Sequence, residues 1–458
     1  MSEENQSIRS EEPDLARVPV LCLTAPPWRN DRVLKDLFAS LGERNARIVG
    51  GAVRNALMGR DVTDIDIATR LHPEEVMRRA EQAGFSPHPV GIDHGSVLLA
   101  RDGRTFEVTT LRRDVRTDGR HAVVAFTDDW REDARRRDFT MNALYADLAG
   151  NVYDPLCSGV RDALAGHVRF IGDANARIRE DYLRILRFFR FWAEYDTGAP
   201  DEDALAAIRR QKEGLRRISR ERIREEMRRL MLAPRAAEAL EYMTATGISA
   251  CILPKACTPK TTALTRMLAI DARLHLQPDW LLRLCAICGP HAALKDLFRL
   301  SRQEASRMHK MDQALAPVCQ LIEQGKAADI RRWQVLASDL GTQTILDALR
   351  LCHARGALTD TDLARLIPAL ETFTPPPFPL SGRDVLALGI APGPQVGQLL
   401  RRVRTRWQEQ GFQPATVEGL KDLLREEAIR QHLIAPESEA GKSPVHKNTA
   451  SDSNTTDP

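Results

Sequence analysis

No run of eighteen consecutive apolar residues occurs in this chain of 458 residues, so the sequence predicts no membrane-spanning segment. The start, MSEENQSIRSEEPD, is polar and acidic and lacks the basic and then apolar order of a secretory signal. The eight cysteines follow no regular spacing, which argues against a disulfide scaffold and favours a reducing cytoplasm. Internal repeats and coiled-coil patterns are absent too, and we expect no membrane contact and no stable protein partner.

The chain also lacks a large charge of one sign, because its net charge at pH 7 is only +3. Bulk charge therefore does not indicate a nucleic-acid partner. The distribution is more informative, since arginine outnumbers lysine and clusters at residues 135–137, 184–190, 216–229 and 401–406. A planar guanidinium group suits phosphates and base edges. Solvated helix faces in an arginine-rich chain explain any single cluster equally well.

Strand patterns are confined to the first part of the chain, and the length predicts two to four packed units. The expected elements are a helix at 33–41, a strand at 47–49, a helix from Gly50-Gly51 to near Gly59, and strands at 64–68, 96–100 and 105–111. Asp102-Gly103 predicts a tight hairpin between the last two strands. After about residue 172 strand signals almost vanish, so the predicted fold class is α+β, with a mixed head followed by a helical body.

Gly50 and Gly51 lie between the predicted strand and the next helix. A backbone without side chains can approach a phosphate closely there, and Arg54 lies one helical turn further on. A Gly-Gly turn alone is weak evidence, because most such pairs only relieve backbone strain.

Asp64 and Asp66 follow this turn at a spacing of two, which places both carboxylates on one face of a strand. Two adjacent carboxylates repel one another unless a cation neutralises them, and Mg²⁺ takes a few carboxylate oxygens together with phosphate oxygens. We therefore expect a Mg²⁺ site that supports in-line nucleotidyl transfer. Glu107, in a neighbouring predicted strand, is the candidate for a third acidic group, and an exposed strand glutamate is the alternative.

The segment RRRDFTMNALYAD supplies the next candidates. Arg137 is predicted to bind a triphosphate, while Asp138 and Asn142 hold the backbone of the site. A helix entry capped by Asp138 is the plainer alternative.

The segment 177–192 predicts a single helix in which Asp181, Arg184, Arg187 and Arg190 recur every three residues. Leu183, Leu186, Phe189 and Trp192 form the opposite, buried stripe. An aspartate that accepts from the amino group of C or A, beside an arginine that donates to the ring nitrogen, would reject U and G without a template. Arg187 and Arg190 would then bind the triphosphate. An amphipathic helix with ordinary salt bridges is the alternative.

Together these blocks resemble the bacterial class II family of CCA-adding tRNA nucleotidyltransferases and poly(A) polymerases. The matching blocks, in order, are GGAVRNALMG with DID, EVTTLR, RRDFTMNAL, DPLCSGVRDAL, REDYLRILRFFRF and ISRERIREEM. They cover roughly residues 47–232, and a weaker likeness, LSGRDVLALGIAPGPQVGQLL, covers 380–400.

The resemblance implies a nucleotidyltransferase head with a small mixed sheet at 25–170, a nucleotide-recognition neck at 171–235, a helical body at 236–370 and a tRNA-binding tail at 371–436. Disorder is expected at 1–24 and 437–458. By the same resemblance Asp64 and Asp66 ligate Mg²⁺, and the incoming ATP or CTP binds Gly51, Arg54, Arg137, Asp181, Arg184, Arg187 and Arg190. Glu221 and Arg222 match a further motif that supports the recognition helix.

The sequence departs from the family at Asn55, where the usual residue is aspartate, and we expect a weakened ion pair in the phosphate loop. No His-Asp pair of a phosphohydrolase domain is present, so no phosphatase activity is expected. Cys285 and Cys288 are interpreted as buried thiols, because no second tight pair or histidine lies at zinc spacing.

The activity that the resemblance implies is addition of C, C and A to the 3′ end of tRNA. A poly(A) polymerase or an enzyme that adds only A shares every catalytic block and stays open as an alternative. A noncatalytic RNA-binding protein on the same fold is the alternative of another class, and the intact Asp64 and Asp66 argue against it. The basic run 401–407 fits either a phosphate-binding face or a solvated helix.

Overall fold

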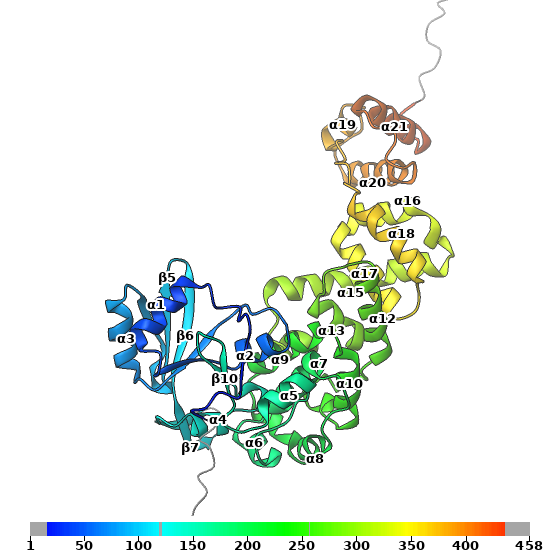
Figure 1. Ribbon diagram of the computed structural model, residues 1–458. Coiled ribbons are helices and arrows are strands. Elements are labelled where there is room, and N and C mark those ends of the chain that lie inside the picture. Colours follow the sequence, from blue (N-terminus) through cyan, green and yellow to red (C-terminus); the bar gives the residue numbers. More distant parts are fainter. Residues whose placement is uncertain (1–15, 119–120, 256, 436–458) are drawn as a thin grey trace, which may run out of the picture. The chain divides into compact units, whose positions relative to one another are not determined.

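A computed structural model describes residues 16–118, 121–255 and 257–435 (Figure 1). These residues pack as two compact units, one made of residues up to 312 together with 350–357, the other of 313–349 and the residues from 358 onward. None of the described helices combines the length and the apolar surface that a membrane crossing needs. The predicted boundaries of head, neck, body and tail stay predictions, because packing divides the chain only into these two units.

A mixed eight-stranded sheet organises the N-terminal part of the first unit (Figure 1). Its strands, in spatial order, are β1 (Leu21–Cys22), β10 (Asn151–Tyr153), β9 (Tyr145–Ala146), β2 (Ala46–Val49), β3 (Asp66–Thr69), β6 (Arg104–Thr110), β5 (Ser96–Arg101) and β4 (Ser86–Gly91). β3 and β6 run parallel, and every other neighbouring pair is antiparallel. The predicted head with a small mixed sheet is therefore confirmed.

The sheet buries side chains on both faces. α1 (Arg32–Leu41) and α3 (Pro73–Gln82) pack on each other, and α3 also contacts β4, β5 and β6. Leu34 and Phe38 of α1 are buried because apolar residues recur at helical spacing, which confirms the predicted helix. A second cluster packs Val49 and Tyr145 against Trp130 of α4 (Trp130–Arg135).

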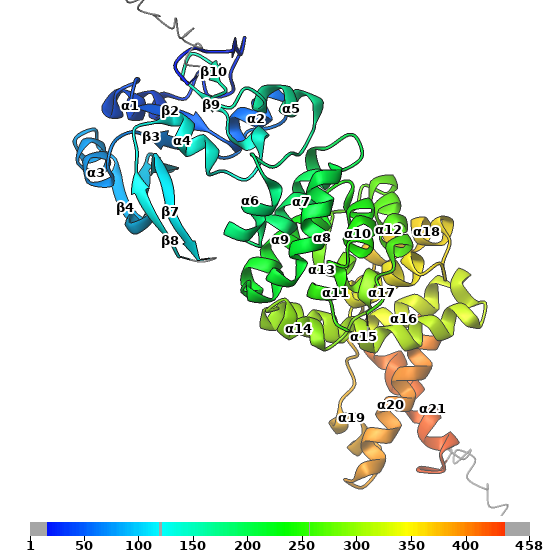
Figure 2. The same ribbon diagram turned by 90° about the horizontal axis from the view of Figure 1, so that it is seen from below.

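The turn between β5 and β6 confirms the predicted hairpin. Asp102 has φ +50° and Gly103 has φ +72°, so both central residues lie in the left-handed region that a two-residue hairpin needs. β7 (Arg112–Asp118) and β8 (His121–Phe126) form a separate two-stranded sheet, which Figure 2 shows apart from the main one.

Two local predictions are wrong. β3 begins at Asp66, so Asp64 lies in the preceding loop and not on the strand, because β2 has no residue left to pair with it beyond Val49. The predicted disorder of 1–24 extends too far, since β1 pairs with β10 and the Val20 N–H donates to the Val152 carbonyl oxygen. Residues 1–15 and 436–458 lie outside the described residues.

Helices make up the described chain after β10, as predicted. Those of the first unit are α5 (Gly159–Ala165), α6 (Ala174–Glu180), α7 (Arg184–Tyr195), α8 (Glu202–Gln211), α9 (Arg220–Leu232), α10 (Ala236–Ala245), α11 (Ser249–Ile252), α12 (Thr261–Arg273), α13 (Trp280–Cys288) and α14 (Ala293–Leu297), with the 3-10 turn η3 (Lys212–Arg217). Two further 3-10 turns, η1 (Ile92–His94) and η2 (Thr140–Asn142), precede β10. α7 packs against α9 and α10, which buries its apolar stripe, including Leu186, Phe189 and Trp192.

α15 (Arg302–Glu323) and α17 (Thr342–Ala354) span the positions at which the two units divide. The second unit also contains η4 (Lys326–Ala328), α16 (Ile330–Leu340), α18 (Asp360–Glu371), α19 (Gly382–Leu386), α20 (Pro394–Glu409) and α21 (Val417–Arg430). Val403 and Trp407 of α20 pack with Leu424 of α21 in its C-terminal core.

Candidate active site

The Gly-Gly turn lies where sequence analysis placed it. β2 ends at Val49 and α2 (Gly51–Leu57) begins two residues later, so the chain turns at Gly50. Gly50 has φ +67°, which a residue with a side chain rarely adopts, and its N–H donates to the Leu144 carbonyl oxygen at 3.0 Å. The turn therefore needs glycine for its conformation, and it leaves bare backbone beside the adjoining cavity.

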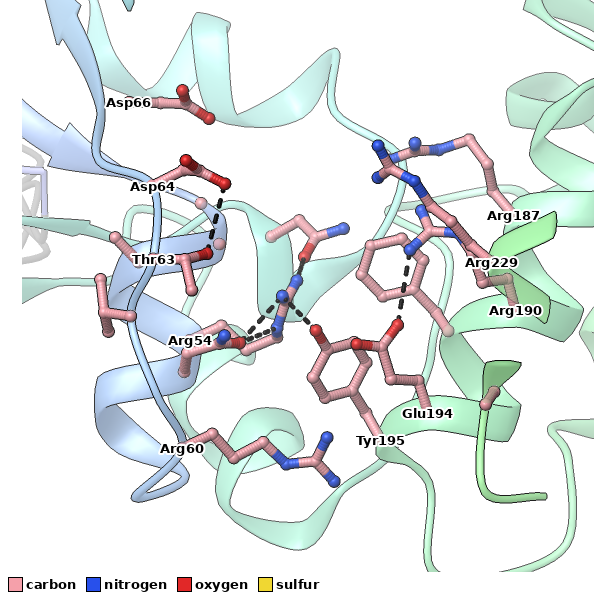
Figure 3. Close-up of a pocket in the computed structure, with 18 of the residues that line it drawn as sticks. Arg54, Arg60, Thr63, Asp64, Asp66, Arg187, Arg190, Glu194, Tyr195 and Arg229 are labelled. Carbon is pink, nitrogen blue, oxygen red and sulfur yellow. Dashed lines mark hydrogen bonds and ion pairs between the residues drawn. The ribbon is translucent and has the colours of Figure 1, made fainter. Parts of the chain in front are cut away.

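A cavity of about 820 Å³ opens beside this turn, and Gly50 and Gly51 line it. Figure 3 shows Asp64 and Asp66 on one wall, facing Arg187, Arg190 and Arg229 across the space. Seven arginines line the cavity in all: Arg54, Arg60, Arg137, Arg187, Arg190, Arg228 and Arg229. A polyphosphate is the natural ligand of so many guanidinium groups, because each presents a fork of donors to phosphate oxygens.

Two of the three predicted acidic residues lie on the cavity wall. Asp64, in the loop, and Asp66, at the start of β3, both line the cavity. Glu107 is exposed on β6, paired in register with Asp66 on the parallel strand, but does not itself line the cavity. The Asp66 side chain is exposed to the cavity, yet the surrounding protein removes part of the hydration of its carboxylate. That burial raises the pKa of Asp66, the charges of Glu107 and Asp64 raise it further, and Arg137 opposes them.

This wall suits a divalent cation. The negative charges of Glu107 and Asp64 add to burial in raising the pKa of Asp66, and a cation at this wall would favour its ionised form. In the described part of the chain no three His, Cys, Asp or Glu side chains form a complete metal site. Mg²⁺ in proteins is usually held by one or two carboxylates together with phosphate oxygens and water, so the two carboxylates of this wall fit its preference.

Arg54 lines the cavity and forms no ion pair with a carboxylate among the described residues. Its guanidinium donates to Asn142 Oδ1, to the Tyr195 hydroxyl at 2.7 Å and to Asn55 Oδ1 at 3.0 Å, and all three acceptors are neutral. Burial lowers the pKa of Arg54, while Tyr195 acts in the opposite direction. A buried cation with only neutral partners has the most to gain from an anionic ligand.

Asn55 has a structural role that an aspartate lacks. Its Oδ1 accepts from Arg54, while its Nδ2 donates to the Asp61 carbonyl oxygen at 2.9 Å. The Arg60 N–H donates to the Asn55 carbonyl oxygen at 2.8 Å. Asn55 thus ties α2 to the loop that leads to Asp64. At Asn55 the structure has neutral hydrogen bonds to Arg54 in place of an ion pair, while the negative charges of Glu194 and Asp138 still act on Arg54.

Asp138 links the sheet to α7. Its carboxylate accepts from Arg187 Nε at 2.7 Å, from Asn142 Nδ2 at 3.0 Å and from the Phe139 N–H at 2.8 Å. Burial alone would raise the pKa of Asp138, but Arg187 and these hydrogen bonds lower it to about 2. Asp138 therefore stays ionised and orients both Arg187 and Asn142, in agreement with its predicted supporting part.

Arg190 is buried, so it does not belong to a solvated helix face. Its Nε donates to Glu226 Oε2 at 2.6 Å. Glu226 also lies 3.6 Å from Arg187. The carboxylate on α9 thus holds two predicted triphosphate ligands of α7 in place, and sequence analysis did not single it out. Glu221, which was singled out, pairs instead with Arg299.

Arg137 is oriented by Asp133. The fully buried Asp133 carboxylate accepts from Arg137 Nη2 at 2.9 Å and from the Tyr145 hydroxyl at 2.7 Å, and it pairs with Arg136 at 2.6 Å. Burial opposes ionisation of Asp133, but the two arginines outweigh it and hold its pKa well below the usual range. Burial also opposes the charge of Arg137, whose pKa Asp133 nevertheless raises. Arg137 is therefore a fixed cation at the cavity wall.

The predicted helix over 177–192 is broken in two. α6 ends at Glu180, Asp181 is extended with φ −154° and ψ 106°, and α7 begins at Arg184. The Asp181 carboxylate accepts from the Leu183 N–H at 3.1 Å, which satisfies a backbone donor at the start of α7. Asp181 therefore does not share a helix face with the arginines, and the predicted single stripe is wrong.

Tyr182 explains why the break persists. Its ring lies so close to Gly214 of η3 that a Cβ atom added there would come within 2.0 Å of the ring. Only glycine leaves room for this contact, which fixes the segment between α6 and α7. Arg222 of α9 adds a second anchor by donating to Asp181 Oδ2 at 2.6 Å.

Neither Asp181 nor Arg184 lines the 820 Å³ cavity. Arg184 donates to Glu180 Oε2 at 2.6 Å and to the carbonyl oxygens of Arg177 and Arg136. Around this one cavity the structure gathers Gly51, Arg54, Asp64, Asp66, Arg137, Arg187 and Arg190. The other two predicted nucleotide ligands, Asp181 and Arg184, do not line it and bind neighbouring protein groups instead.

Several cavity residues escaped sequence analysis. Tyr195 packs its ring against the guanidinium carbons of Arg54, at 4.0 Å, and Arg60, at 4.7 Å. Arg228 and Arg229 come from α9. Tyr195 lies one turn beyond Phe191 on α7 and 141 residues after Arg54, so only the fold brings Tyr195 and Arg54 together. Arg228 and Arg229 were visible in the sequence as a basic run, but the sequence did not show that they line the cavity.

This arrangement of paired carboxylates and fixed cations on a mixed sheet is that of a nucleotidyltransferase. Comparison with known proteins agrees. Residues 46–169 match the family model "Poly A polymerase head domain", and 199–258 match "Probable RNA and SrmB- binding site of polymerase A".

The chain is 32% identical over 397 residues to the mitochondrial CCA tRNA nucleotidyltransferase 1 of Danio rerio, covering 82% of this chain and 86% of that one. It is 32% identical over 365 residues to the CCA-adding enzyme of Geobacillus kaustophilus, covering 78% and 86%. The solved structure of the Bacillus stearothermophilus CCA-adding enzyme with CTP aligns with a TM-score of 0.69 at 27% identity, over 89% and 99%. This chain belongs to the class II family of tRNA nucleotidyltransferases and poly(A) polymerases.

Proposed function

We propose that this protein adds C, C and then A to the 3′ end of tRNA from CTP and ATP. The observation that carries the proposal is the cavity in which Asp64 and Asp66 face seven arginines. Support comes from relatives named CCA tRNA nucleotidyltransferase and CCA-adding enzyme, and from a related structure that contains CTP. The proposed substrates are thus the tRNA acceptor end, CTP and ATP.

In the proposed reaction the tRNA 3′-hydroxyl attacks the α-phosphate, a new P–O bond forms, and pyrophosphate leaves. Asp64 and Asp66 would hold Mg²⁺, which when bound lowers the pKa of the hydroxyl and neutralises charge on the leaving group. Glu107 contributes by its negative charge beside Asp66, which favours cation binding at this wall.

The triphosphate would bind between the two walls. Arg54 on α2 and Arg137 just after α4 line one part of the cavity, Arg187 and Arg190 on α7 line another, and the backbone at Gly51 accepts close contact. Asp133, Asp138 and Glu226 hold three of these arginines before substrate arrives. Such preorganised cations stabilise developing charge without rearranging during the reaction.

Asp181 and Arg184 are the proposed readers of the base. An aspartate that accepts from the amino group and an arginine that donates to the ring nitrogen fit C and A, and oppose U and G. In this structure the Asp181 carboxylate accepts from Arg222, and the Arg184 guanidinium donates to Glu180. Base reading therefore requires that they exchange these partners for the edge of the nucleotide.

The proposed tRNA-binding tail has exposed cations on α20. Arg404 pairs with Asp339 and Arg406 with Glu426, each at 3.0 Å, while Arg401 and Arg402 are exposed. The latter two are the proposed contacts to the RNA backbone. All eight cysteines are free, which fits the proposed cytoplasmic location.

We expect Asp181→Ala and Arg184→Ala to relax the discrimination against UTP and GTP. Each change removes one of the two charge-assisted hydrogen bonds that recognise the base, and a lost bond of this kind corresponds to about tenfold or more in selectivity. Incorporation of each of the four nucleotides on tRNA that lacks CCA measures the effect.

Glu202→Ala is the matched control, since Glu202 lies in the first turn of α8 and does not line the cavity. Its selectivity should equal that of the unmodified enzyme. Unchanged selectivity in both Asp181→Ala and Arg184→Ala would remove the base-reading part of the proposal.

A further inference from the structure

A second, larger cavity of about 1240 Å³ lies in the first unit and shares no lining residue with the catalytic cavity. Its wall includes Arg47 on β2 and Arg70 just after β3, together with Arg44 and Lys35. β2 therefore carries the catalytic Gly-Gly turn at its C-terminal end and this basic wall toward its N-terminal end. The proposed nucleotidyl transfer uses none of these basic residues.

Arg47 and Arg70 both reach the same aromatic side chain. The Arg47 guanidinium lies 4.4 Å from the Trp130 ring centre and 3.7 Å from that of Tyr153, and the Arg70 guanidinium lies 5.6 Å from Trp130. Arg47 donates to the Ala16 carbonyl oxygen, and Arg70 to the Asp128 carbonyl oxygen. Aromatic stacking and backbone acceptors thus hold both side chains in place.

No carboxylate among the described residues forms an ion pair with Arg47 or Arg70. Burial lowers the pKa of Arg47 to about 10, and the nearby charge of Arg70 acts in the same direction. Arg47 is thus a partly desolvated cation with a second cation nearby, and the charges of Tyr153 and Asp147 offset this only in part. A bound anion would offset both the repulsion and the lost hydration.

The carboxylates of this cavity are engaged elsewhere or exposed. Asp36 pairs with Arg101 at 2.6 Å. Asp147 accepts from the Asn151 N–H and Nδ2, each at 2.9 Å, and from the Tyr153 hydroxyl at 3.2 Å. Glu43 is exposed. Five arginines and Lys35 line the cavity against these three carboxylates, so its wall carries a net positive charge.

We propose that this cavity binds a compact polyphosphate, either free pyrophosphate or the polyphosphate group of a nucleotide, through Arg44, Arg47 and Arg70. Guanidinium groups match phosphate oxygens in geometry as well as charge. The volume slightly exceeds the range of roughly 300–1,000 Å³ that is typical of small-molecule sites, so the space suffices for either ligand. Because the two cavities share no residue, occupation of this site does not require displacement of substrate.

Arginine footprinting tests the site directly. The intact enzyme is treated with phenylglyoxal in the presence of a chelator, and modification of Arg44 and Arg70 is followed by mass spectrometry while pyrophosphate is titrated. We expect saturable protection of both residues. In Arg70→Gln, half-protection of Arg44 should require about tenfold more pyrophosphate or higher, because one charge-assisted contact is lost.

Arg78→Gln is the matched control, since Arg78 is exposed on α3, pairs with Glu75 and lies outside the cavity. It should leave protection unchanged. Arg44→Gln, read at Arg70, serves as a second variant, because Arg44 is exposed and its replacement spares the fold.

Parallel titrations with ATP and with a single-stranded RNA distinguish the sources of phosphate. Protection by pyrophosphate alone, or by pyrophosphate and ATP, supports the proposal and identifies the ligand. Protection by RNA alone, no protection, or equal protection in Arg70→Gln and the control overturns it.

Discussion

Replacement of Asp64 by alanine is expected to lower the rate of nucleotide transfer by about 10³-fold or more. A cation held at this wall contributes several kcal/mol to the stabilisation of the transition state, and each 1.4 kcal/mol corresponds to about tenfold in rate. Asp64 lines the cavity, and the hydroxyl of Thr63 donates to its carboxylate at 3.2 Å. Since Asp64 is exposed, its loss should spare the fold. Single-turnover incorporation of CTP measures the change.

Asp61→Ala is the matched control for this experiment. Asp61 is an exposed aspartate of the same loop that does not line the cavity, and only its backbone carbonyl contacts Asn55. Its rate should stay within about twofold of the unmodified enzyme, as expected for a surface change. Full activity in Asp64→Ala, with a normal melting temperature, would show that the metal wall is assigned to the wrong residue.

Asp133→Ala is expected to lower the free energy of unfolding by about 3–5 kcal/mol, because it leaves buried charge without its counter-ion. Arg136, Arg137 and the Tyr145 hydroxyl all converge on this one carboxylate. Urea unfolding, followed by tryptophan fluorescence, measures the loss. Arg137 also loses its orientation, so the KM for CTP and ATP should rise under conditions in which the variant is folded.

Asp128→Ala provides the comparison, since Asp128 is exposed a few residues earlier and its side chain is not part of the Asp133 cluster. A change of less than about 0.5 kcal/mol is expected there. If Asp133→Ala destabilised the protein no more than this control, the cluster would not be the anchor of Arg137.

The features that were predictable from the sequence are those that depend on local backbone chemistry. Glycine is favoured at Gly50 because of its positive φ, and the hairpin at Asp102-Gly103 depends on the same left-handed conformation at its two central residues. The buried stripe of α7 was predictable as well, since apolar spacing reports which face packs inward.

The break at Asp181 was not predictable in this way. Asp181, Tyr182 and Leu183 all tolerate a helix, so the local sequence gives no stop signal. The break depends on the contact between Tyr182 and Gly214 and on the hydrogen bond from Arg222, and both partners are distant in sequence. The same reason hid Tyr195, whose hydroxyl meets Arg54 only in the folded chain.

Charge patterns identified the arginines but not their partners. Arg187 and Arg190 look alike in the sequence, yet Asp138 holds one and Glu226 the other. Arg137 depends in turn on Asp133. The carboxylates that fix these cations come from other elements, so spacing along one helix could not reveal them.

Incorporation of nucleotides on three tRNA transcripts tests the proposed function most directly. The transcripts lack CCA, end in C, or end in CC, and CTP and ATP are supplied with Mg²⁺ alone and together. We predict addition of two, one and no C from CTP, followed in each case by a single A. Addition of A only, whether once or as a long tail, would contradict CCA addition and leave a poly(A) or A-adding enzyme on the same catalytic residues.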